Sequence, residues 1–218
     1  MTVGQDMIWQ PKENQTVYNL DVAYGIVRER LAKADVRRQC ERSGAELQAD
    51  GSVMLRYLNQ SYRIDVSRGT VSSVADNQAV SLRESILLLH YFTQAKGTPL
   101  ARNQITYRDL PGGLVYYPTF AQRTIEPLVE YFGERPPLLG KAAGAVGGVP
   151  GHMGDSSLEI PAFPRVPVII IIWRSDGELP PGGNLVFDAS ITDYLESEDV
   201  TVVCETITWR LVNCARAL

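Results

Sequence analysis

The segment from Pro167 to Asp188 constrains the fold of this chain more than any other. It begins with an apolar run, Val168 to Trp173, passes through an acidic loop rich in proline and glycine, and ends with a short apolar strand before Asp188. The run is far shorter than the roughly 20 apolar residues that a membrane-spanning helix needs. A short isoleucine-rich run of this kind predicts a central strand that is buried on both faces.

The length and composition of the chain are those of a globular protein with one core. It has 218 residues, of which 44% are hydrophobic and 21% are charged, so disorder is not expected. We predict a loosely held tail at residues 1–15 and a single domain over 16–218. The first residues lack the basic and apolar regions of a signal peptide, so we expect a cytoplasmic protein whose cysteines stay reduced.

The charge and cysteine patterns exclude several function classes. The net charge of −4 argues against nucleic acid as a partner, because a nucleic-acid-binding protein needs a dominant basic face. The cysteines, Cys40, Cys204 and Cys214, form no C-x-x-C pair, which argues against a zinc or iron–sulfur site made of thiolates alone. We expect no membrane partner, and the sequence does not indicate an oligomeric state.

Hydrophobic periodicity predicts the remaining elements. Ser81 and Glu84 form a capping box ahead of an apolar run, and Gly97 ends the helix that follows. The expected elements are a helix at 16–38, a three-stranded antiparallel meander at 53–74, and helices at 82–95, at 119–132 and, with Ser197 as its N-cap, at 197–214. The last segment is rich in β-branched residues, which leaves a strand as the alternative.

The order of these elements predicts an α+β protein rather than a regular alternation of strands and helices. We expect a mostly antiparallel sheet in which strand 168–173 is central. Helices, including 82–95 and 197–214, are expected to pack against this strand.

Two common catalytic signatures are absent from the chain. The glycine-rich stretch at 140–151 lacks the spacing of a phosphate-binding loop, and Gly140-Lys141 is followed by alanine. No G-x-S-x-G motif occurs, and the histidines are His90 and His152 alone.

Four carboxylates form a candidate metal site. Asp176 and Glu178 follow the buried strand, Asp188 ends the next strand, and Asp155 follows a Gly-His-Met-Gly sequence. If the two strands are neighbours, these acids converge at one edge of the sheet, where their oxygen atoms suit Mg²⁺ or Ca²⁺. The alternative is turn chemistry, because Asp-Gly is a turn dipeptide and Asp188 is placed to cap a helix near Ile191.

Aromatic residues and one histidine form a second candidate site. His90 lies on the least apolar stripe of helix 82–95, together with Arg83, Leu87 and Gln94. A pocket for a flat or apolar ligand would be lined by His90, Tyr91, Tyr107, Tyr117, Phe120 and Arg123. Packing of the aromatic rings in the core is the alternative.

Several short motifs, in order, resemble the DUF3786 family of uncharacterised prokaryotic proteins. The resemblance covers roughly residues 15–212 and rests on these segments: His90-Tyr91, Gly97-x-Pro99, Ile105-Thr-Tyr107-Arg-Asp-Leu-Pro-Gly-Gly113, Tyr117-x-x-Phe120, Gly154-Asp155, Trp173-Arg-x-Asp176-x-Glu178 and Leu185-x-Phe187-Asp188. Some family members resemble fusions to an iron–sulfur-binding segment, and this chain has no such cysteine cluster. The family pattern also singles out the polar residues His90, Asp155, Asp176, Glu178 and Asp188.

Two functions follow as hypotheses. The first is an accessory protein that binds a small molecule or a metallocofactor of the tetrapyrrole type, with His90 as an axial ligand or hydrogen-bonding group. The second is a metal-dependent hydrolase or lyase that uses Asp155, Asp176, Glu178 and Asp188. The sequence contains no catalytic pair at short spacing, which favours the binding protein and leaves the ligand open.

Overall fold

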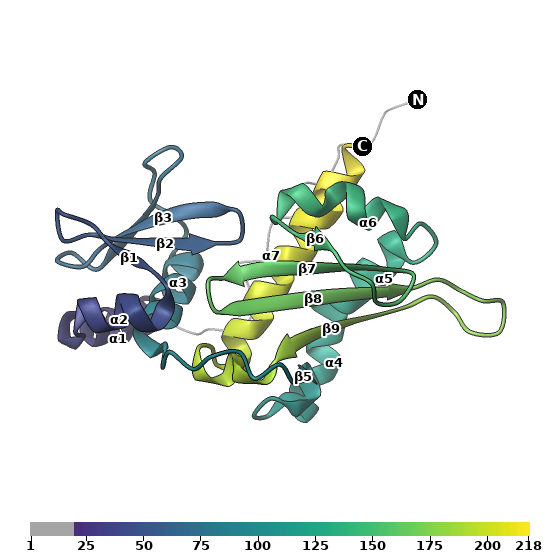
Figure 1. Cartoon of the computed structure of the whole chain (residues 1–218), viewed down its shortest axis with the longest axis horizontal. Helices are drawn as coiled ribbons and strands as arrows, with labels where there is room; N and C mark the ends of the chain where they lie inside the picture. The colour runs from purple at the N-terminus through teal and green to yellow at the C-terminus, as the bar shows by residue number, and fades with distance from the viewer. Residues whose placement is uncertain (1–19) are drawn as a thin grey trace.

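The protein is an α+β structure with two antiparallel sheets (Figure 1). The computed structural model describes residues 20–218. The tail predicted at 1–15 therefore lies outside the described residues. The buried residues of both sheets belong to one hydrophobic core.

The smaller sheet contains the predicted meander and one additional short strand. Its order is β1-β2-β3-β4. The strands are β1 (Glu46–Leu47), β2 (Val53–Tyr57), β3 (Gln60–Asp65) and β4 (Thr70–Ser73). Alternation places Val53, Leu55 and Tyr57 in the core, as the period of two predicts.

The larger sheet has the order β5-β9-β8-β7-β6, so β8 is its central strand, as predicted. The strands are β5 (Gln104–Thr106), β6 (Val149–Pro150), β7 (Ser156–Phe163), β8 (Val166–Trp173) and β9 (Gly182–Asp188). Val168, Ile170 and Ile172 are fully buried in the core. Burial of both faces is incomplete, because Ile169 is half-buried and Trp173 is exposed.

Two of the predicted helices are each divided by a local break. Residues 16–38 were expected to form one helix, but α1 (Leu20–Lys33) ends before α2 (Val36–Ser43), because the Asp35 carboxylate caps α2 by accepting a hydrogen bond from the Arg38 amide. The helix expected at 119–132 is α4 (Gly113–Arg123) followed by α5 (Ile125–Phe132). The boundary between α4 and α5 lies at Thr124, whose hydroxyl donates to the Phe120 carbonyl.

The remaining helices follow the predictions more closely. α3 (Leu82–Gln94) begins at the Ser81 cap, which accepts from the Glu84 amide. The last two helices are α6 (Pro137–Ala142) and α7 (Ser197–Arg216), and short 3₁₀ turns lie at 107–109, 143–145 and 189–193. The helical prediction for the C-terminal segment is thus confirmed over its strand alternative. Glu196 rather than Ser197 is the N-cap, and it forms a capping box with Asp199.

The helices lie on different parts of the two sheets. Helices α5 and α6 pack against β9 and β7, and α7 packs on both of these helices and passes behind the larger sheet in Figure 1. Helix α3, which we expected on β8, packs instead on α1, α2 and β4 and also reaches α7. It meets the larger sheet through Tyr91, whose ring stacks on Phe163 at the end of β7.

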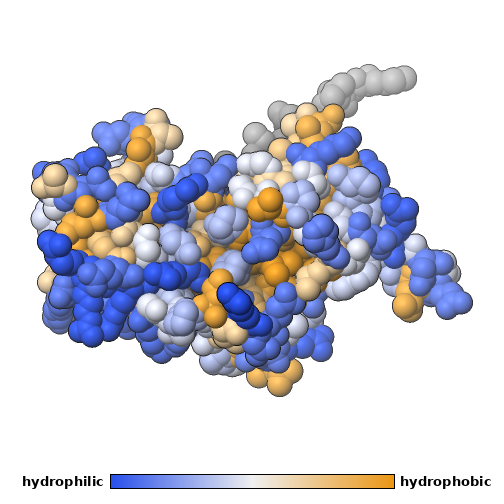
Figure 2. Space-filling model, in the orientation of Figure 1, coloured by the Kyte–Doolittle hydropathy of each residue, from blue (hydrophilic) through white to orange (hydrophobic). Residues whose placement is uncertain are grey.

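The hydropathy of the surface differs between the region of α1 and α2 and the region of the larger sheet. In the view of Figure 2, hydrophilic residues cover α1 and α2, and apolar residues gather over the middle of the larger sheet. Among residues 20–218, no helix is both long and apolar enough to cross a lipid bilayer.

Candidate functional site

Tyr91, predicted as a ligand-binding residue, is a core residue of α3. Its ring is fully buried between Phe163, at a centroid distance of 4.0 Å, and Tyr194, at 5.9 Å. Its hydroxyl donates to the Ser43 carbonyl at 2.6 Å and accepts from the Arg165 amide at 3.2 Å. Every face of this side chain is therefore occupied by protein, which favours the packing alternative.

The other predicted aromatic residues lie on α4 and on the 3₁₀ turn that precedes it. Tyr107 and Phe120 are buried and stack at a centroid distance of 3.9 Å. The Tyr107 hydroxyl donates to the Ser197 carbonyl and accepts from the Thr201 hydroxyl at 3.0 Å, which ties this aromatic pair to α7. Tyr117 is half-buried under the Arg108 guanidinium, which lies 3.8 Å from the ring centroid.

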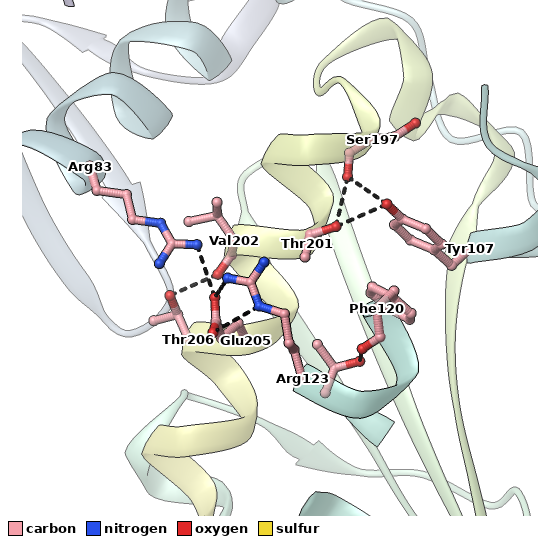
Figure 3. A network of polar contacts seen from close by, with 10 residues as sticks. Arg83, Tyr107, Phe120, Arg123, Ser197, Thr201, Val202, Glu205 and Thr206 are labelled. Carbon is pink, nitrogen blue, oxygen red and sulfur yellow. Dashed lines mark hydrogen bonds and ion pairs between the residues drawn. The ribbon is translucent and has the colours of Figure 1, made fainter. Parts of the chain in front are cut away.

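Arg123 belongs to an ion-pair network centred on Glu205 of α7. Arg123 and Arg83 approach this carboxylate from opposite sides (Figure 3). Arg123 makes two parallel hydrogen bonds, Nη2 to Oε2 at 2.5 Å and Nε to Oε1 at 3.2 Å, whereas Arg83 makes one, Nη2 to Oε2 at 2.9 Å. The Glu205 side chain is only 8% exposed. Such a carboxylate stays charged only when it is paired, and the two-point contact with Arg123 is the stronger pairing.

His90 lies apart from the aromatic residues, between α3 and the first turn of α7. Its Nδ1 is 3.0 Å from Oδ1 of Asp199, and its Nε2 has no hydrogen bond with the described residues. Burial lowers the pKa of His90, but the hydrogen bond to Asp199, the charge of that carboxylate and the charge of Glu196 outweigh burial and the opposing charge of Arg30. The net effect raises the pKa of His90 above its ordinary value.

The raised pKa of His90 predicts a pH-dependent contribution to stability. Because protonated His90 is favoured in the folded state, its contribution is fully present below the ordinary histidine pKa of about 6.5 and is lost as pH rises through the higher folded-state pKa. The wild-type protein should therefore exceed His90→Gln in free energy of unfolding at low pH, and this difference should shrink as pH rises. Urea unfolding at a series of pH values measures it, and a constant difference would contradict the assigned ion pair.

The carboxylates proposed for a metal site do not converge as expected. β8 and β9 are neighbours, but they are antiparallel, so Asp176 lies before one end of β9 and Asp188 lies at the other end. The seven residues of β9 extend over about 20 Å at 3.4 Å per residue. Within residues 20–218, no group of three or more histidine, cysteine or acidic side chains is placed to hold a metal ion.

Each of the three aspartates accepts a hydrogen bond from a backbone amide. Asp155 accepts from the Arg174 amide at 2.8 Å, and Asp176 accepts from the amides of Glu178 and Leu179. The hydrogen bonds from Leu179 and Glu178 lower the pKa of Asp176. Glu178 is exposed in the same loop. These contacts favour the turn alternative for Asp176, whereas Asp155 accepts from a residue 19 positions away.

Asp188 both caps a turn and fixes a loop. It accepts from the Ser190 amide at 3.0 Å, as the capping alternative predicts, and from the amides of Ala101 and Arg102 at 2.8 and 2.7 Å. Arg102 has a left-handed backbone with φ of 55°, which is unfavourable for a residue other than glycine. The two hydrogen bonds from 101 and 102 offset that strain, so Asp188 has a structural role.

A groove between α3 and α7 brings together polar residues that the sequence did not mark as a site. Its volume is about 270 Å³. Eleven residues line it: Tyr57, Ser81, Arg83, Glu84, Leu87, Val202, Glu205, Thr206, Trp209, Arg210 and Asn213. The α7 members recur at intervals of three and four residues, so they form one face of that helix. Apart from Arg123, which reaches the groove through Glu205, the predicted ligand-binding residues lie elsewhere.

Tyr57, which lines the groove, and its neighbour Tyr62 are both buried. Tyr57 is 1% exposed, and its hydroxyl lies near Thr206 without a hydrogen bond of normal geometry. Burial raises the pKa of Tyr57, so the hydroxyl stays protonated and can donate. The Tyr62 hydroxyl lies 2.8 Å from side-chain oxygens of both Glu84 and Gln60, and burial together with the Glu84 charge raises the pKa of Tyr62 to about 12.

The sequence carried a partial signal for this groove. The stripe of Arg83, Leu87, His90 and Gln94 is the polar side of α3, and its first two members line the groove. Glu205 and Arg210 lie on the polar side of the C-terminal helix, but nothing in their local sequence shows that they face α3.

Comparison with known families adds one result. Residues 35–210 match the sequence profile of a family described as Domain of unknown function (DUF3786). The chain belongs to the DUF3786 family. No curated protein and no solved structure gives a significant match. The DUF3786 match includes every groove residue except Asn213, and it includes the Arg83–Glu205–Arg123 network.

Proposed function

We propose that this DUF3786 protein is a binding protein for a small anionic molecule, which it holds in the groove between α3 and α7. The proposal rests on the hydrogen-bond donors that Arg83 has left over after its contact with Glu205. Its guanidinium lines the groove and makes one contact with Glu205, whose charge is already matched by the two-point contact of Arg123. The other N–H groups of Arg83 have no partner within the described chain.

The charge balance of the groove supports an anion. Within residues 20–218, Arg83, Arg210 and Arg123 form ion pairs with two carboxylates, Glu84 and Glu205. Arg123 joins this cluster from outside the groove lining and leaves the cluster with one positive charge. A guanidinium with free donors binds carboxylate and phosphate groups through charge-assisted hydrogen bonds. The Arg83 side chain is 35% exposed, so a dissolved ligand can reach it without unfolding of the protein.

The other groove residues define the rest of the ligand. Leu87, Val202 and the rings of Tyr57 and Trp209 provide apolar surface. Binding sites combine such surface with a few placed polar groups. The volume of about 270 Å³ lies just below the range of about 300 to 1,000 Å³ that is typical of small-molecule sites. These features support a compact ligand with an anionic group and an apolar body.

A metallocofactor of the tetrapyrrole type would use a different part of the molecule. With Nδ1 of His90 bound to Asp199, only Nε2 could coordinate a metal ion, an arrangement that is typical of histidine ligands. His90 does not line the groove, so the two proposals are separate. The visible absorbance spectrum of the natively purified protein distinguishes them, because a bound tetrapyrrole absorbs strongly there and a small carboxylate does not.

Substitution Arg83→Gln tests the groove directly. A panel of sodium carboxylates, from acetate to octanoate with benzoate, is compared by thermal unfolding at constant ionic strength. A panel member at 100 times its dissociation constant should raise the Tm of the wild type by about 5 to 10 °C. Loss of a hydrogen bond to a charged group should weaken its binding by about 10- to 100-fold in Arg83→Gln.

The matched control is Arg63→Gln. Arg63 is an exposed arginine of β3, paired with Asp50 outside the groove, and its substitution should leave binding unchanged. If no carboxylate shifts the wild type, or if both substitutions weaken binding equally, the proposed site is wrong.

A further inference from the structure

The groove contains a second arginine whose charge is weakly matched. Arg210 Nη2 lies 3.3 Å from the Gln60 amide oxygen and 3.9 Å from Oε1 of Glu84. The Tyr62 hydroxyl lies 2.8 Å from both Glu84 Oε1 and Gln60 Oε1. The carboxylate nearest to Arg210 is beyond hydrogen-bond distance from it.

The two groove arginines are positioned at different points along the axis of α7, Arg83 through its contact with Glu205 and Arg210 as a residue of the helix. Arg83 is fixed on the groove wall by Glu205, and Arg210 follows Glu205 by five residues. At 1.5 Å per residue, their anchor points on the helix are about 7.5 Å apart along its axis. Val202, Trp209 and Leu87 of the same groove provide apolar surface.

We infer that the ligand of this groove carries two anionic groups joined by a short apolar spacer, one bound by Arg83 and the other by Arg210. This inference rests on the proposed function and adds the class of ligand, a dicarboxylate or a molecule of equivalent chemistry. Each guanidinium offers a planar pair of donors that matches one carboxylate. The spacer packs on the apolar side chains that line the groove.

Matched acid series test the inference on the full-length protein. Linear dicarboxylates from succinate to pimelate are compared with monocarboxylates of equal carbon number by isothermal titration calorimetry at constant ionic strength. At one chain length, the dicarboxylate should bind at least about tenfold more tightly than its monocarboxylate, because a second charge-assisted contact is made. Arg210→Gln should remove this advantage and leave monocarboxylate affinity within about twofold, whereas Arg83→Gln should weaken both series.

Each other outcome has a distinct meaning. If monocarboxylates bind in an Arg83-dependent manner but dicarboxylates bind no better, the ligand does not carry a second anionic group. The inference is then contradicted, and the proposed function stands. If Arg210→Gln weakens both series equally, Arg210 does not bind the second carboxylate specifically, and the inference again fails. If neither series binds, both proposals fail. Circular dichroism of each variant, with Arg63→Gln as the control, confirms that the compared proteins are folded.

Discussion

Replacing Tyr91 by alanine should destabilise the protein by about 3 to 5 kcal/mol, the cost of removing a large aromatic side chain from a core. The ring lies between Phe163 and Tyr194, and no water-filled space adjoins it, because its relative exposure is 0%. A domain is stable by only about 5 to 15 kcal/mol, so this one change removes a large part of the total. Urea unfolding followed by circular dichroism measures the loss.

Two companion substitutions separate the ring of Tyr91 from its hydroxyl. Tyr91→Phe keeps the stacking but leaves the Ser43 carbonyl and the Arg165 amide without their partner, at a cost of about 1 to 3 kcal/mol. Tyr116→Ala is the control, because Tyr116 is 62% exposed, and it should change stability by no more than about 0.5 kcal/mol. If Tyr91→Ala kept wild-type stability and altered only ligand binding, the sequence-based assignment of Tyr91 to a pocket would be restored.

Substitution Arg123→Ala should cost about 2 kcal/mol. Removing one partner of a buried ion pair costs about 3 to 5 kcal/mol, and the value is reduced here because Arg123 is 37% exposed and Arg83 still contacts Glu205. Adding Glu205→Gln to Arg123→Ala should recover part of the loss, since no unmatched charge then remains. The free energy of unfolding of the single and double variants provides the measurement.

Arg83 provides the comparison for the stability loss of Arg123→Ala, because both arginines contact Glu205. Arg83→Ala should change stability by no more than about 1 kcal/mol, because it removes one partly exposed contact. If Arg83→Ala proved as damaging as Arg123→Ala, Arg83 would be a structural partner of Glu205, and its availability to a ligand would be contradicted.

Elements encoded by local pattern were predictable from the sequence. The isoleucine run placed β8 at the centre of a sheet, and the Ser81–Glu84 pair marked the start of α3, because strand burial and helix capping depend on residues close together in the chain. The break at Asp35 was missed because the helical spacing of apolar residues continues across it. Which surface α3 packs against was also missed, since this depends on the shapes of both sheets.

The candidate site was less predictable, for two physical reasons. An aromatic residue of a pocket and one of a core have the same sequence pattern, and only the ring of Phe163 opposite Tyr91 distinguishes them. Conversely, the groove depends on Arg83 meeting Glu205 across 122 positions, a separation over which local pattern carries no information. Arg123 was predicted to line an aromatic pocket, and its ion pair with Glu205, 82 positions away, could not be predicted from local pattern.

The position of α7 in chain order has a consequence for folding. This helix follows every strand, yet it joins distant parts of the molecule through His90–Asp199, Tyr107–Thr201 and Gln60–Arg210, contacts that span 109, 94 and 150 positions. Contacts of such long separation close large loops and form slowly. While the chain is being made, the surfaces of α5 and α6 that α7 covers therefore stay exposed until α7 is complete, and apolar surface exposed in this way is prone to aggregation.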